Sequence, residues 1–202
     1  MKKINSAILF LTVLITVSCS GKADSEYEKQ IDETRKQKNE YMKNDPNSPV
    51  NSDTRAEYHP LKYFEPDTSF IFRSKLTELD KKDTIKIFGT KGEEREAIRY
   101  GYLLLETKDD VHRLNVYKNK SQNGTDYYSV WFTDETTNEE TYGVGRYLDF
   151  EKSEDSNYVY TIDFNLAFNP YCAYSAMFSC AIPSKEDHLE FAVLAGEKKF
   201  HE

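Results

Sequence analysis

The sequence has few of the residues that usually identify a metal or cofactor centre. Its 202 residues include three cysteines, four histidines, eight glycines and a single tryptophan. No pair of histidine, cysteine or carboxylate residues has the close spacing typical of zinc ligands, so no metal site is predicted. Gly143-Val144-Gly145 lacks the following helix and lysine of a phosphate-binding loop, and it predicts a tight turn instead. The sequence therefore predicts no cofactor.

Positive charge is also scarce. Lysine and arginine number 27 against 35 aspartates and glutamates, which gives a formal net charge of -8. Binding to a nucleic acid backbone needs clustered basic residues that displace counterions, so nucleic acid is excluded as a partner. The acidity is typical of a soluble surface.

Long hydrophobic runs are missing except at the N-terminus. Lys2 and Lys3 precede a short apolar run over residues 4–17, which is too brief for a comfortable membrane span. Cys19 follows, and the chain then becomes polar. This pattern resembles a bacterial lipoprotein signal peptide over residues 1–18, with Cys19 as the lipidated first residue. The alternative is an ordinary secretory signal. In either case we expect the folded part to be exported.

Two cysteines remain once Cys19 is set aside. Cys172 and Cys180 would meet an oxidising compartment after export, where a pair of cysteines more often forms a disulfide than stays free. A disulfide is the favoured prediction. A reactive cysteine beside a second one, or two unlinked buried thiols, are the alternatives.

The N-terminal part of the mature chain predicts a helix on a tether. Residues 19–25 are expected to form the lipid-anchored tether. Residues 26–46 contain no glycine and no internal proline, and they carry a thin apolar stripe that suits packing on a surface. The helix must end by Asp45-Pro46, because the residue before proline is driven out of the helical region.

The remaining residues, 47–202, predict one β-rich domain. A proline-rich connector over 47–66 comes first, anchored by Leu61, Tyr63 and Phe64. About eight strand-like runs with short polar turns follow, with no long helix between them. We expect a mainly β (α+β) fold, an antiparallel sandwich or barrel-like sheet with one N-terminal helix. The expected strands are 69–76, 84–90, 95–107, 112–119, 126–134, 146–151, 157–164 and 189–198.

Candidate site residues gather between Thr141 and Pro183, where aromatic and polar residues alternate. Asp163 and Asn165 share a strand face, and Arg146 could pair with a carboxylate inside the fold. Such a pair could be a structural polar network or part of a ligand site. The candidate ligand-binding residues are Tyr142, Arg146, Asp149, Asp163, Asn165, Asn169, Tyr171 and Tyr174.

Several of these positions also resemble a known family, the bacterial domain of unknown function 1684. The similarity runs from the predicted helix to Lys198. It departs at Ala181 and Ser184, where proline is common, and at His188, where asparagine is common. It implies an exported, lipoprotein-like domain and no particular activity. The residues that carry it are Ser48-Pro49, Leu61 to Phe64, Arg99 to Gly101, Phe132 to Asp134, Glu140 to Asp149, Asp163 to Asn165, Asn169 to Tyr174, Cys180 and Ala195 to Lys198.

Two functional hypotheses follow. The favoured one is an outer-membrane lipoprotein, facing the periplasm or the cell surface, held to the membrane through Cys19. It would bind a polar or anionic small ligand or an envelope protein, because arginine beside tyrosine and asparagine suits planar anions. The alternative is a hydrolase or redox enzyme that uses Cys172, or Asp149 with Asp163 as an acid–base pair. No histidine is spaced to activate Cys172.

Overall fold

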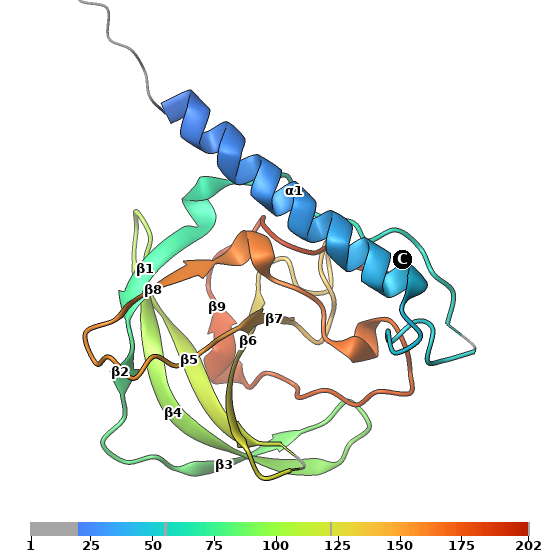
Figure 1. Ribbon diagram of the computed structural model, residues 1–202. Helices are drawn as coiled ribbons and strands as arrows, with labels where there is room; N and C mark the ends of the chain where they lie inside the picture. Colours follow the sequence, from blue (N-terminus) through green and yellow to red (C-terminus); the bar gives the residue numbers. More distant parts are fainter. Residues whose placement is uncertain (1–19, 55, 122, 202) are drawn as a thin grey trace, which may run out of the picture.

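The computed structural model describes residues 20–54, 56–121 and 123–201, and it is mainly β (Figure 1). The signal peptide and Cys19 lie outside the described residues. One long helix, α1 (Ser20–Asn44), precedes the strands. Four short 3-10 helices occur at Thr68–Phe70, Phe164–Leu166, Tyr171–Ala173 and Lys185–Asp187. The strands are β1 (Ile71–Lys75), β2 (Thr77–Glu78), β3 (Thr84–Phe88), β4 (Glu94–Glu106), β5 (Val111–Lys120), β6 (Asp126–Asp134), β7 (Arg146–Asp149), β8 (Val159–Asp163) and β9 (His188–Leu189).

The strands form two sheets. The larger has the order β2-β4-β5-β6-β7, with β3 added to β4 and β9 to β6, and the smaller pairs β1 with β8. All the pairings are antiparallel except that of the short β9 with β6. The Ser74 hydroxyl of β1 accepts a hydrogen bond from Leu104 N of β4 at 2.8 Å, which joins the two sheets. The predicted mainly β, antiparallel fold with an N-terminal helix is confirmed.

The core lies between the sheets because apolar residues alternate along the central strands. Strands β4, β5 and β6 each place every second residue on the inner face, where leucine, valine and phenylalanine side chains are buried. Phe164 and the chain after β9 close this core. Its members from the central strands are Leu103, Leu105, Leu114, Val116, Val130 and Phe132.

Helix α1 lies across the top of the strands (Figure 1). Ile31 and Met42 are 3% and 1% exposed, so the thin apolar stripe packs on the body as predicted. The helix begins at Ser20, and residues 20–25, predicted as a tether, are helical. It ends at Asn44 as expected. Asn51 Nδ2 donates to the carbonyl of Lys43 at 3.0 Å, which satisfies an acceptor at the helix end. No helix in the described part of the chain is both long and apolar enough to span a membrane.

The connector and the glycine turn also follow the sequence. Residues 47–54 and 56–66 form no strand, and a bridge between Tyr63 and Glu197 and a hydrogen bond from Ser175 Oγ to Asp53 Oδ2 at 2.8 Å help to hold them to the domain. Gly145 has a φ of 96°, and its N–H donates to Tyr142 O at 2.9 Å. A Cβ atom at Gly145 would lie 2.4 Å from Phe132 O, so the predicted tight turn requires glycine.

A buried arginine organises the domain's C-terminal end. Arg146 is fully buried, and its guanidinium donates to Asp134 Oδ2 at 2.7 Å and to Val193 O at 2.9 Å. It also donates to Ala195 O. The predicted Arg146–carboxylate pair therefore exists, but its partner is Asp134 rather than Asp163.

The same arginine explains a wrong prediction. Residues 189–198 were expected to form a strand, but β9 stops at Leu189. The carbonyls of Val193 and Ala195 accept from Arg146, so they are not available to a neighbouring strand. Gly196 has a φ of 77°, which bends the chain further.

We predict that Arg146→Met destabilises the domain severely. The substitution leaves the Asp134 carboxylate buried without its countercharge, which costs about 3–5 kcal/mol of unfolding free energy. Arg73→Met is the matched control, because Arg73 lies exposed on β1 and should change stability by less than about 0.5 kcal/mol. Urea unfolding of both variants measures the difference. Equal stability of the two would contradict this account of Arg146.

Candidate functional site

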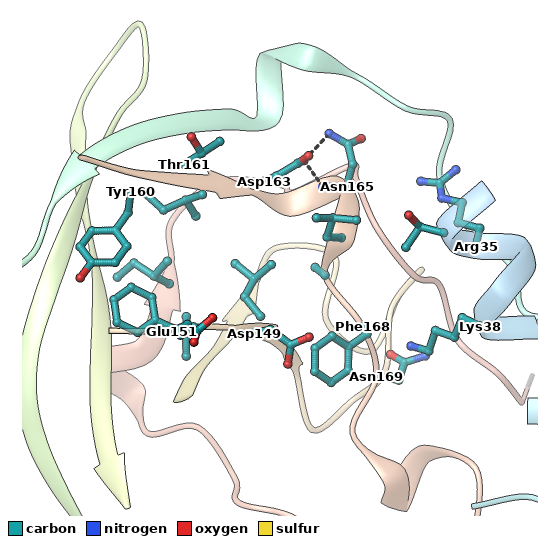
Figure 2. Close-up of a pocket in the computed structure, with 18 of the residues that line it drawn as sticks. Arg35, Lys38, Asp149, Glu151, Tyr160, Thr161, Asp163, Asn165, Phe168 and Asn169 are labelled. Atoms are coloured by element: carbon teal, nitrogen blue, oxygen red, sulfur yellow. Dashed lines mark hydrogen bonds between the residues drawn. The ribbon is translucent and has the colours of Figure 1, made fainter. Parts of the chain in front are cut away.

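A cavity of about 860 Å³ lies between α1, the small sheet and the inner face of the large sheet (Figure 2). Its volume falls in the range typical of small-molecule sites. The inner part is apolar and is built by side chains from five strands. These are Leu103, Leu114, Val130, Leu148 and Ile162.

Two cations reach the cavity from α1. Arg35 and Lys38 are three residues apart, so they lie on the one helix face that lines the cavity, and Lys38 extends toward Phe168 and Asn169 (Figure 2). The Arg35 guanidinium lies over the Tyr63 ring at 4.6 Å. Its Nε and Nη2 atoms are buried and have no hydrogen-bond partner among the residues that the structure describes. Burial lowers the pKa of Arg35, and the nearby Tyr63, Asp32 and Glu65 oppose this shift.

Lys38 is compensated by a buried carboxylate, Glu197. The Lys38 ammonium donates to Glu197 Oε2 at 2.7 Å and lies 4.9 Å from the centre of the Phe168 ring. Glu197 Oε1 accepts from Asn169 Nδ2 at 3.0 Å and from the Tyr174 hydroxyl at 2.5 Å. Burial first, and then the charge of Glu197, raise the pKa of Tyr174. This network fixes α1 against the domain beside the cavity.

The opposite side of the cavity is acidic. Asp149 and Glu151 are exposed and lie away from α1 (Figure 2). The Asp149 side chain has no hydrogen bond or ion pair with any residue in the described ranges. Lys152 also lines this side of the cavity, where its ammonium donates to Ser153 O at 3.3 Å and lies 3.8 Å from the Glu154 carboxylate. The cavity therefore has two cations on α1 and an unpaired carboxylate at the end of β7.

Asp163 lines the cavity but is already hydrogen-bonded. Its carboxylate accepts from Asn165 N and Asn165 Nδ2, each at 2.9 Å, and from the Tyr27 hydroxyl at 2.9 Å. The Asn165 amide in turn bonds both backbone groups of Asp67 at 2.8 Å. Both residues thus hold the chain before β1 against the end of β8, which is a structural role.

The structure brings six of the eight predicted ligand-binding residues to the cavity and places two elsewhere. Those that line it are Asp149, Asp163, Asn165, Asn169, Tyr171 and Tyr174. Arg146 is enclosed with Asp134, and Tyr142 contacts Cys172 instead. Sequence reasoning missed the cations of α1. Their three-residue spacing was a usable signal, but a charged helix face is usually solvated.

Cys172 and Cys180 are free cysteines in the structure, not the favoured disulfide. They are nevertheless neighbours, because Cys172 N donates to Cys180 Sγ at 3.2 Å. A hydrogen bond from the Cys180 thiol, followed by one from the Tyr142 hydroxyl, lowers the pKa of Cys172 to about 6 although burial opposes this. The same bond and burial raise the pKa of Cys180.

Neither a base nor a metal accompanies the cysteines. In the described part of the chain, the contacts of the four histidines are with Phe200, Phe191 and Thr133, and none is with Cys172. Nor does any group of three or more histidine, cysteine or acidic residues there have metal-binding geometry. The pKa of Cys172 is therefore lowered, but no histidine among the described residues contacts this cysteine to act as the general base of a hydrolase.

Comparison with known proteins identifies the family. The model of the family described as "Protein of unknown function (DUF1684)" matches residues 56–198. The chain belongs to this family. A DUF1684 match over these residues includes both sheets but leaves out α1.

One solved structure is similar over most of its length. It is the solution NMR structure of an uncharacterised protein from Haloarcula marismortui, with 26% sequence identity and a TM-score of 0.63. The similarity covers 90% of this DUF1684 chain and 98% of that one. No curated protein matches the chain.

We predict that the reduced protein alkylates fastest at Cys172. The rate with iodoacetamide should rise with pH around a midpoint near the Cys172 pKa of about 6, because the thiolate is the nucleophile. Cys180→Ala removes the hydrogen bond from Cys180, and the midpoint should then move toward the ordinary thiol value of about 8.5. Intact mass measured against pH gives both curves.

Two results would contradict this prediction. One is a wild-type midpoint at the ordinary thiol value. The other is a Cys180→Ala curve identical to that of the wild type. The same mass measurement without reductant tests the disulfide, because a bridged pair reacts only after reduction.

Proposed function

We propose that this protein is a cell-envelope lipoprotein whose β-rich domain binds a small amphipathic anion in the cavity beneath α1. The observation that carries the proposal is Arg35, a half-buried cation whose Nε and Nη2 atoms have no described partner. A desolvated guanidinium is stabilised by an anion nearby, and its planar donors suit a carboxylate or a phosphate.

The apolar interior argues for an amphipathic ligand rather than an inorganic anion. Leu103, Leu114 and Val130 lie deep in the cavity, and α1 brings the cations to one side of it. A ligand with an apolar body and an anionic head would bury its body against the strands and direct its head toward Arg35 and Lys38.

The contacts favour binding over the enzymatic alternative. An acid–base pair of Asp149 and Asp163 would need both carboxylates available to a substrate. The Asp163 carboxylate already accepts hydrogen bonds from Asn165 N, Asn165 Nδ2 and the Tyr27 hydroxyl. Cys172 lacks a histidine neighbour in the described residues and does not line the large cavity. These contacts argue against catalysis by Asp163 or Cys172, and they do not argue against ligand binding in the cavity.

Calorimetric titration with octanoate tests the proposal, with octan-1-ol as the neutral ligand of equal chain length. We expect octanoate to bind at least about tenfold more tightly than the alcohol, because a hydrogen bond to a charged group contributes about 1.5–3 kcal/mol. Arg35→Gln should weaken octanoate by a similar factor. Lys36→Gln, on the exposed face of α1, is the control and should leave affinity unchanged.

Equal affinity for the two ligands, or equal loss in the two variants, would show that Arg35 is not an anion site. Absence of octanoate binding to the wild type would overturn the proposed ligand class. Thermal unfolding of each variant confirms that the folded protein is being compared.

The membrane anchor has its own test. Cys19 is the only cysteine of the N-terminal segment, so Cys19→Ala removes the proposed lipid attachment site. We expect the wild type to sediment with bacterial membranes and the variant to remain in the soluble fraction, with a mass lacking the acyl chains. If both fractionate with the membrane and carry the same mass, the lipoprotein assignment is wrong.

A further inference from the structure

A second cavity, of about 380 Å³, adjoins the first across the end of β7. Four residues line both cavities: Leu148, Asp149, Phe168 and Tyr171. The rest of its wall comes from β6, from the chain between Pro170 and Ala181, and from Arg95 of β4 and Tyr147 of β7. It is a separate space with a different composition.

Aromatic rings make up much of its wall. Trp131 lies 6.0 Å from Tyr147, ring centre to ring centre, and Tyr147 packs edge to face on Phe168 at 6.3 Å. Tyr171 and Phe178 form another edge-to-face pair at 5.2 Å. These contacts brace the rings in place before any ligand arrives. The aromatic residues of the wall are Tyr127, Tyr128, Trp131, Tyr147, Phe168, Tyr171 and Phe178.

Among the described residues, this cavity is lined by one cation, Arg95, and one carboxylate, Asp149. Arg95 is already paired, because its Nη2 donates to Glu93 Oε1 at 2.5 Å and to Ser179 O at 2.9 Å. Asp149 has no such partner among the described residues. A cation that entered the cavity would therefore meet an uncompensated carboxylate and several aromatic side chains.

We infer that the second cavity binds a small organic cation, such as a quaternary ammonium group. Aromatic faces attract cations through their quadrupole, and a neighbouring carboxylate adds direct charge attraction. The ammonium group would lie among Trp131, Tyr147 and Phe178 with Asp149 beside it. This inference goes beyond the proposed function and uses neither Arg35 nor Lys38.

The single tryptophan makes the site directly observable. Trp131 lines only the second cavity, so its emission reports on that space and not on the anion site. Titration of the full chain with choline should change Trp131 emission saturably. The neutral isostere, with carbon in place of the quaternary nitrogen, should bind at least about tenfold more weakly, because cation–π attraction and Asp149 act only on the charged ligand.

Variants divide the site into its parts. Asp149→Asn keeps the size of the side chain and should weaken choline by about tenfold through loss of the countercharge. Phe178→Ala should also weaken choline, because it removes a wall of the second cavity alone. Glu151→Gln is the control. This exposed carboxylate two residues away lines only the first cavity, so choline affinity should stay unchanged.

The inference is overturned if choline and its isostere bind equally, if Asp149→Asn binds choline like the wild type, or if neither emission nor calorimetry detects choline. Octanoate titration of the same samples separates this result from the proposed function. Octanoate binding without choline binding overturns only the cation site. Choline binding without octanoate binding overturns only the anion site. Circular dichroism of each variant shows that the fold is retained.

Discussion

A guanidinium group inside the protein is the constraint on which the rest of the structure depends. A buried charge must be paired and hydrogen-bonded, and Arg146 meets this requirement with Asp134 and two carbonyls of the segment after β9. Those bonds hold residues 193–195 and so position Glu197 two residues later. The Glu197 carboxylate then accepts hydrogen bonds from Lys38 of α1 and from Asn169 and Tyr174 in the segment after β8. The Arg146–Asp134 ion pair thus contributes, through Glu197, to the position of the helix over the cavity.

The strands could be predicted because the pattern of apolar and polar residues that specifies each strand lies within that strand. Apolar residues recur at every second position of β4, β5 and β6 and face the core, although Tyr117 and Trp131 on the other face are buried as well. A proline ends α1 where expected. Residues 189–198 have an equally apolar composition, but the Arg146 side chain of β7 donates hydrogen bonds to the carbonyls of Val193 and Ala195. That competition joins residues 47 positions apart, and no local pattern contains it. The first turns of α1 were missed for the opposite reason, since a glycine-containing polar segment has weak helix propensity of its own.

The candidate site was predictable on one side only. The dense polar and aromatic stretch supplied Asp149, Asn169 and Tyr174, which line the cavity, because strand ends and irregular segments often carry site residues. The positive side comes from a helix more than a hundred residues earlier, whose charged face reads as solvated. Arg146 was given a role in ligand binding because arginine, tyrosine and aspartate occur together, but its partner lay before the glycine turn. The nearness of these residues in the sequence suggested that they form one cluster. The turn at Gly145 instead places Arg146 beside Asp134.

The boundary of the family match carries a further consequence. The matched residues 56–198 supply the apolar interior and the acidic side of the large cavity, whereas Arg35 and Lys38 lie outside them on α1. In the function we propose, the anionic head of the ligand would therefore be recognised from α1, and its apolar body by residues within the family match. Substitution of Arg35 would then change selectivity for the head and leave the apolar interior intact.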